Sequence, residues 1–83
     1  MEITLKLHAM LSDYLPTHAD RYSVQLDIPV GTTPHQVIDR FSIPHGQAHL
    51  VLLNGVYIDP ADRDDPVIKE GDVLAVWPPI AGG

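Results

Sequence analysis

The sequence predicts an α+β domain in which a mixed sheet of about five strands is packed by one main helix. Three observations lead to this prediction. Two segments near the start of the chain alternate apolar and polar residues, a strong helix-start signal follows them, and an Asn-Gly dipeptide then joins two apolar runs ahead of a last apolar strand. A chain of 83 residues supports one domain and not two.

The first two strands are indicated by alternation. Ile3, Leu5 and Leu7 fall on one face of the first strand, with polar residues between them. The segment 9–15 then carries apolar residues at helical spacing and is expected to form a short helix or turn. Alternation returns over 22–28, which predicts the second strand.

The main helix has the clearest local signal in the chain. Thr33 stands as an N-cap, Pro34 occupies the first helical position, and Gln36 follows three residues after the cap. This is a capping box, with proline where its missing N–H costs nothing. The helix must end before Pro44.

The second half of the chain predicts a hairpin and a last strand. An Asn-Gly dipeptide between the apolar runs 50–53 and 56–58 is a strong hairpin signal. A polar, proline-bounded loop over 59–66 precedes the last strand at 73–77. Two strands, a packing helix, a hairpin and a final strand form the β-grasp (ubiquitin-like) arrangement.

The last strand is apolar on both faces. Val73, Ala75 and Trp77 lie on one face, and Leu74 and Val76 lie on the other. Strands of this kind need cover on both sides, whereas the sequence supplies one good helix. Either an apolar sheet face stays partly exposed and receives a partner, with Leu74, Val76 and Trp77 as its interface, or the short helix after the first strand and the loops cover it.

Composition excludes several classes of function. Eleven acidic residues against five basic ones give a net charge of −6, which argues against nucleic-acid binding and favours a partner with a basic surface. With no cysteine, the chain has no disulfide, cysteine metal site or catalytic thiol. The sequence shows neither a signal peptide nor an apolar run long enough to cross a membrane, so we expect a cytoplasmic protein.

No metal site is expected. His45 and His49 have the spacing of two ligands on a helix, but Pro44 and Gly46 argue against a helix there. The aspartates of 59–65 lack the spacing of a calcium loop. The other three histidines are scattered along the sequence and suggest no shared site.

The C-terminal residues read as an extended, flexible tail. Pro78 and Pro79 cannot donate to a sheet and favour extended geometry. Six extended residues reach up to ~20 Å, and Gly82 and Gly83 end the chain as bare backbone. The predicted organisation is a domain over 1–77 and a tail over 78–83.

The terminal carboxylate is the chain's unusual chemical group. With a pKa near ~3.5 it is ionised and unreactive at neutral pH. Adenylation would make it an electrophile that sulfide, a persulfide or an enzyme thiol could attack. Because the chain has no cysteine, any sulfur that it carries covalently as a nucleophile must sit on this terminus.

These features resemble the MoaD/ThiS family of ubiquitin-like sulfur carriers, and within it the small subunit of molybdopterin synthase. The resemblance spans the whole chain and is carried by Asn54-Gly55, Gly71-Asp72 and Trp77-Pro78-Pro79-Ile80-Ala81-Gly82-Gly83.

The resemblance implies a mechanism. An E1-like enzyme adenylates Gly83 with ATP, and a sulfurtransferase system converts it to a thiocarboxylate. The tail then enters the large synthase subunit, where the sulfur builds the dithiolene of molybdopterin. The chain would bind no cofactor and would be no enzyme by itself. The resemblance implies that Gly83 carries the sulfur and that Gly82, which has no side chain, lets the tail enter a narrow channel. The residues that would direct the tail into this channel are Pro78, Pro79, Ile80 and Ala81.

Three alternatives remain. The same activated terminus would serve a carrier for thiamine or another sulfur metabolite. It would also serve a ubiquitin-like modifier that forms an isopeptide bond through Gly83. In a plain interaction module, the tail would be inert.

Overall fold

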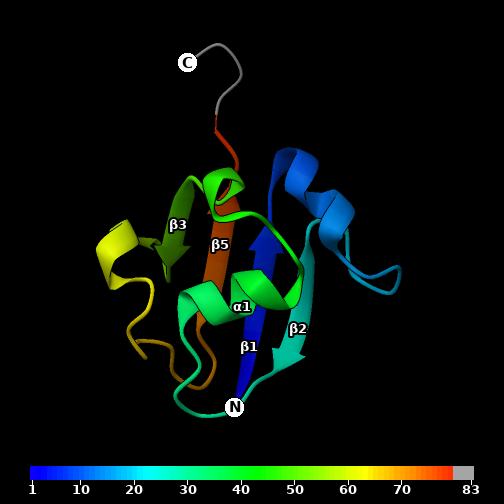
Figure 1. The fold of residues 1–83 in the computed structure, drawn as a ribbon. Coiled ribbons are helices and arrows are strands. Elements are labelled where there is room, and N and C mark those ends of the chain that lie inside the picture. Colours follow the sequence, from blue (N-terminus) through cyan, green and yellow to red (C-terminus); the bar gives the residue numbers. More distant parts are fainter. Residues whose placement is uncertain (80–83) are drawn as a thin grey trace.

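The computed structural model describes residues 1–79 of the chain. Strands and helices follow one another in the order that the sequence predicts, with short 3-10 helices between them (Figure 1). The elements are β1 (Glu2–Leu7), η1 (Ala9–Tyr14), β2 (Ser23–Asp27), α1 (Pro34–Arg40), η2 (His45–Gln47), β3 (Leu50–Leu53), β4 (Val56–Tyr57), η3 (Pro60–Asp62) and β5 (Val73–Trp77).

The five strands form one mixed sheet in the order β2-β1-β5-β3-β4. β1 and β5 pair in parallel at its centre, and the other neighbours are antiparallel. The prediction of a mixed β-grasp sheet is confirmed. Because β5 is central, the residues after it leave the sheet from its middle strand (Figure 1).

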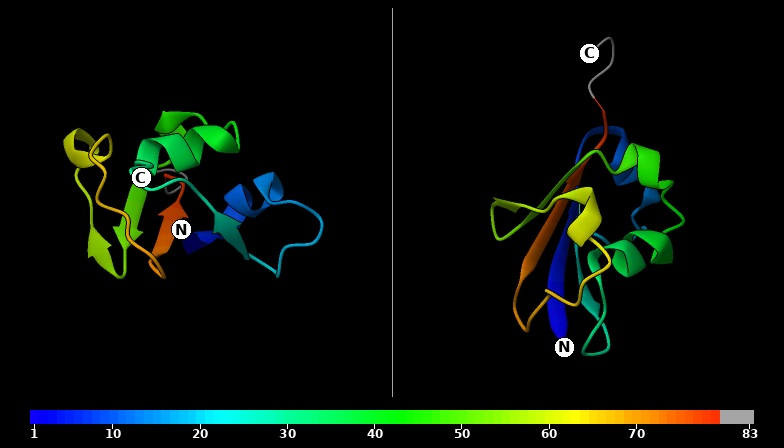
Figure 2. Two further views of the ribbon diagram at one scale, coloured as in Figure 1. Left: turned by 90° about the horizontal axis from the view of Figure 1, so that it is seen from below. Right: turned by 60° about the vertical axis from the view of Figure 1, so that its left-hand side comes forward.

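The helical segments lie on one side of the sheet, and no helix formed by residues 1–79 covers the opposite face (Figure 2). η1 belongs to the covered side, because its Leu11 is fully buried in the hydrophobic core. The core side chains with at most 1% exposure include Ile3, Leu5 and Leu7 of β1, Val37 and Ile38 of α1, Val51 of β3, and Leu74 and Val76 of β5.

The capping box predicted for α1 is present. The Thr33 hydroxyl accepts a hydrogen bond from the Gln36 N–H at 3.1 Å, and the Gln36 side chain accepts one from the Thr33 N–H at 2.9 Å. With seven residues, α1 depends on packing against the sheet for its stability. No helix within residues 1–79 is long and apolar enough to cross a membrane.

The Asn-Gly hairpin is also confirmed. Asn54 and Gly55 adopt φ angles of 51° and 83°, the left-handed geometry of a tight hairpin turn. The Asn54 side chain then joins this turn to the start of β5: its Nδ2 donates to Asp72 Oδ1 at 2.9 Å, and its Oδ1 accepts from the Val73 N–H at 2.9 Å. The hairpin is thereby held against the central strand.

Candidate functional site

The root of the tail is the end of β5, where hydrogen bonding continues on both sides up to the last strand residue. The His8 N–H donates to Val76 O at 3.0 Å, and the His49 N–H donates to Trp77 O at 3.0 Å. The two prolines that follow have no N–H and end both ladders. The chain therefore departs from a firmly held central strand (Figure 1).

An aromatic cluster packs at this root. The rings of His8 and Trp77 stack with centroids 4.0 Å apart and planes 4° apart. Tyr22 contacts His8 at a centroid distance of 4.9 Å. Burial, and to a lesser extent the charge of Lys6, lowers the pKa of His8 below its ordinary value of 6.5. The imidazole is therefore neutral at pH 7 and covers the indole as a flat, uncharged ring.

The open sheet face is apolar over its half beside this root. Leu52 pairs with both Ala75 and Tyr57, and Leu50 pairs with Trp77, so these five residues share a face. Leu50 is 36% exposed and Tyr57 is 49% exposed. Of the two arrangements that the sequence left open, the exposed apolar face is the one observed. We call these five residues the apolar strip. The half over β1 and β2 is polar and carries Thr4, Lys6, Ser23 and Gln25.

Two of the three residues predicted for the partner interface lie elsewhere. Leu74 and Val76 have 0% exposure, because they face α1 in register with the core residues Leu5 and Val51. Their assignment to a surface is wrong. The sequence shows two apolar faces on β5 but not which one α1 covers. Trp77, the third, remains partly exposed.

The structure describes the first two tail residues, with Pro78 half-buried and Pro79 exposed. The roles predicted for the rest of the tail concern residues outside the described part and stay predictions. These residues are Ile80, Ala81, Gly82 and Gly83.

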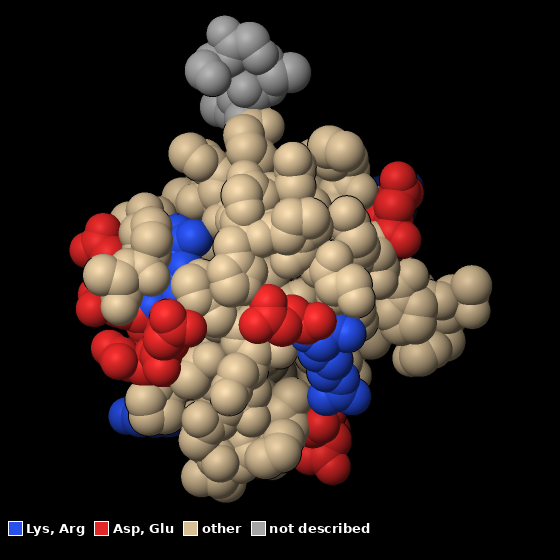
Figure 3. All heavy atoms as spheres, in the orientation of Figure 1, with Lys and Arg blue, Asp and Glu red and all other residues tan. Residues whose placement is uncertain are grey.

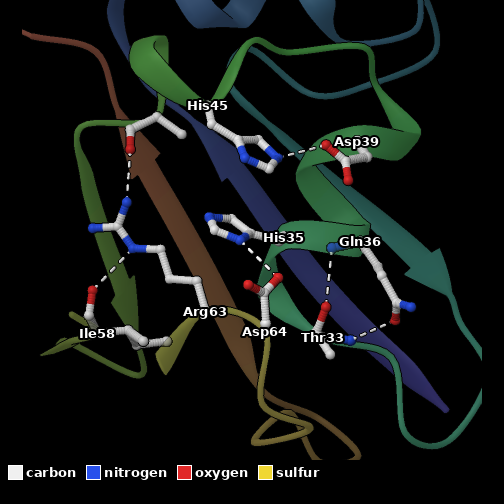
Figure 4. A network of polar contacts seen from close by, with 9 residues as sticks. Thr33, His35, Gln36, Asp39, His45, Ile58, Arg63 and Asp64 are labelled. Atoms are coloured by element: carbon white, nitrogen blue, oxygen red, sulfur yellow. Dashed lines mark hydrogen bonds and ion pairs between the residues drawn. The ribbon is translucent and has the colours of Figure 1, made fainter. Parts of the chain in front are cut away.

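A polar cluster distinct from the aromatic cluster joins α1, η2 and the acidic loop (Figure 4). The rings of His35 and His45 stack with centroids 4.0 Å apart. His35 Nδ1 lies 2.9 Å from Asp64 Oδ1, and His45 Nε2 lies 2.7 Å from Asp39 Oδ1. Sequence spacing gave no sign of this pairing. Within residues 1–79, no three or more His, Cys, Asp or Glu side chains are grouped to hold a metal ion.

Arg63 is the residue whose burial the sequence gives least reason to expect. It lies in the polar loop predicted over 59–66, yet it is only 3% exposed. Its Nε donates to Ile58 O at 3.0 Å and its Nη1 to Ala48 O at 2.8 Å (Figure 4). Its Nη2 donates to His49 O at 3.2 Å. Because the His49 N–H in turn bonds Trp77, Arg63 connects the loop to the tail root.

Comparison with known proteins gives a family and several solved structures, including the following two. The ThiS family matches residues 15–83. SAMP1 from Haloferax volcanii is similar over 100% of both chains, with a TM-score of 0.69 and 22% identity. A chain of the protein–protein complex of subunits 1 and 2 of the molybdopterin-converting factor from Helicobacter pylori 26695 is similar over 100% of both chains, with a TM-score of 0.59 and 17% identity. These two likenesses establish the ubiquitin-like β-grasp fold. No curated protein matches the sequence.

Proposed function

This chain belongs to the ThiS family, and we propose that it is a sulfur carrier that supplies molybdopterin synthesis as the small subunit of a synthase. The observation that carries the proposal is the extent of the family match, which includes the tail and ends at Gly83. The structural likeness to a chain of a molybdopterin-converting factor supports this acceptor over others. The chain is not an enzyme by itself in this role.

The chemistry takes place at the Gly83 carboxylate. The carboxylate attacks the α-phosphate of ATP on an E1-like enzyme, and pyrophosphate leaves. Sulfide delivered by a sulfurtransferase then attacks the acyl carbon, and AMP leaves with the bridging oxygen. One oxygen of the carboxylate has been replaced by sulfur. The chain contains no cysteine on which this sulfur would otherwise reside.

The tail root suits a partner that draws the tail into its active site. The tail departs from the central strand beside Trp77, so the partner meets a fixed starting point. The apolar strip lies next to this root and offers surface for the large synthase subunit to cover. The net charge of −6 accelerates encounter with partners that have basic surfaces.

Intact mass spectrometry tests the proposal. The chain is incubated with an E1-like enzyme, ATP and a sulfur donor, and we expect a mass gain equal to sulfur replacing one oxygen, localised to Gly83. Deleting Gly83, or adding one residue after it, is expected to abolish sulfur transfer while circular dichroism stays unchanged. The matched control is Gly46→Ala, where an added Cβ meets no atom within 4 Å. Full transfer activity in either tail variant would rule the mechanism out.

The acceptor is decided by a second step with the same material. If the thiocarboxylate forms but the large synthase subunit does not consume it, the chain carries sulfur for thiamine or another metabolite. Conjugates of higher mass in cell extract, linked through Gly83 to lysine, would identify a ubiquitin-like modifier. An unchanged mass with a competent activating enzyme would identify an inert tail.

A further inference from the structure

A second apolar surface lies away from the tail root, between the β3–β4 hairpin and the loop 59–67. Its exposed members are large: Val56 is 68% exposed, Val67 is 38% exposed, and Tyr57, which also belongs to the apolar strip, is 49% exposed. Together with their neighbours they line a groove of about 460 Å³. The other lining residues are Leu53, Asn54, Ile58, Asp62 and Asp65.

Two carboxylates, those of Asp62 and Asp65, border this groove, and neither forms an ion pair with a residue in 1–79. Arg63 stands between them in sequence, but its guanidinium is turned inward and donates to three backbone carbonyls. The guanidinium is buried, with its carbon 5.8 Å from the centroid of the Tyr57 ring, whereas the two exposed carboxylates border the groove.

The distribution of charge separates this groove from the tail root. Figure 3 shows several acidic side chains, with some basic atoms between them, on the side of the molecule that carries the loop 59–67, while the surface directly below the tail is uncharged in that view. The groove thus combines an apolar floor with a negative border.

We propose that the groove is a second docking site, which binds a segment of a partner protein with apolar side chains between arginines or lysines. The apolar side chains fill the groove and the flanking cations face Asp62 and Asp65. A second copy of this chain is a poor occupant, because it also carries a net charge of −6. The chain's own C-terminus would bring a carboxylate to an already negative border.

The groove and the tail root have different roles in this arrangement. A partner held at the groove leaves the tail free to reach that partner's active site. Binding of the partner and reaction at Gly83 therefore depend on different parts of the chain. The proposal does not depend on sulfur chemistry, because the groove is built from β4 and the loop 59–67 and not from the tail.

Nuclear magnetic resonance with the full ¹⁵N-labelled chain tests the groove directly. The probe is an N-acetylated, C-amidated hexapeptide with two leucines between two arginines, and the matched probe has glutamates in place of the arginines. We expect saturable shifts of the Val56 and Val67 amides, which lie outside the apolar strip, with the first peptide, and none with the second. Shifts that do not saturate, or that centre on the apolar strip, would overturn the proposal.

A pair of double variants separates groove binding from general attraction. Replacing Asp62 and Asp65 with asparagine is expected to weaken peptide binding about fivefold, as loss of two exposed ion pairs implies. The control replaces the exposed Asp13 and Asp20 with asparagine, which changes the net charge equally. Equal weakening in both variants would show non-specific attraction and refute the site. The amide spectra report whether each variant is folded.

Discussion

Replacing Arg63 with alanine tests whether one buried guanidinium holds the acidic loop against the tail root. The substitution removes hydrogen bonds to the carbonyls of Ile58 at 3.0 Å, Ala48 at 2.8 Å and His49 at 3.2 Å. The first two bonds are buried, whereas the third is only partly buried. Water can therefore reach the His49 carbonyl after the substitution, but the other two carbonyls lose their charged partner in the interior.

The expected loss follows from these contacts. A hydrogen bond to a charged group contributes ~1.5–3 kcal/mol, so the two buried bonds are worth ~3–6 kcal/mol. Removing the guanidinium also relieves the cost of dehydrating it, which brings the expected loss to about 3 kcal/mol. The free energy of unfolding of a domain of this size is ~4–12 kcal/mol. Arg63→Ala should therefore remove a large share of the stability.

Urea unfolding followed by the fluorescence of Trp77, the single tryptophan, measures this loss. The control is Arg40→Ala, because Arg40 is exposed and makes one hydrogen bond, to Asp27 O at 3.2 Å. We expect the control to lose less than ~1 kcal/mol. Arg63→Lys should recover only part of the loss, since an ammonium lacks the planar fork. Equal losses in Arg63→Ala and Arg40→Ala would refute the reasoning.

Four further outcomes are expected. The pKa of His8 is lowered in the folded state, so the unfolded chain binds more protons between that pKa and 6.5. The free energy of unfolding therefore falls as the pH drops through this window. Stability measured against pH should show a flatter profile for His8→Phe than for the unchanged chain. Leu74→Ala leaves a cavity in the core and should cost ~3 kcal/mol in urea unfolding. Leu52→Asp on the apolar strip should weaken binding to the large synthase subunit in calorimetry, whereas Gln25→Asp on the polar half should not. Gly55→Ala is strained by φ of 83° alone and should cost ~1 kcal/mol, since an added Cβ meets no atom within 4 Å.

Local signals account for the part of the fold that the sequence predicts well. The capping box at Thr33 and the Asn54-Gly55 turn each depend on residues within four positions of one another, and both appear as expected. The alternation in β1 also suffices to place Ile3 in the core. These features are decided by backbone geometry that neighbouring residues fix.

The remainder depends on contacts between distant segments. His35 and Asp64 are 29 positions apart, and Arg63 and Ala48 are 15 apart, so no local pattern reports either contact. An arginine in a polar loop usually faces water. The burial of Arg63 follows from the carbonyls of Ala48 and His49, which lie between η2 and β3, and of Ile58, which follows β4. The face of β5 that α1 covers is likewise set by strand pairing, so the sequence alone does not show that Leu74 is buried.

The parallel pairing of β1 with β5 has a mechanical consequence. The N-terminus and the end of β5 lie at opposite ends of the molecule (Figure 1). A force that pulls Met1 and Pro79 apart acts along both strands, so it loads the bonds from the Thr4–Val73 pair to the Leu7–Val76 pair together, in shear. An edge hairpin pulled apart at one end opens one pair at a time. An unfolding enzyme that pulls this protein from its tail therefore meets its greatest resistance at β5, the first strand that it encounters.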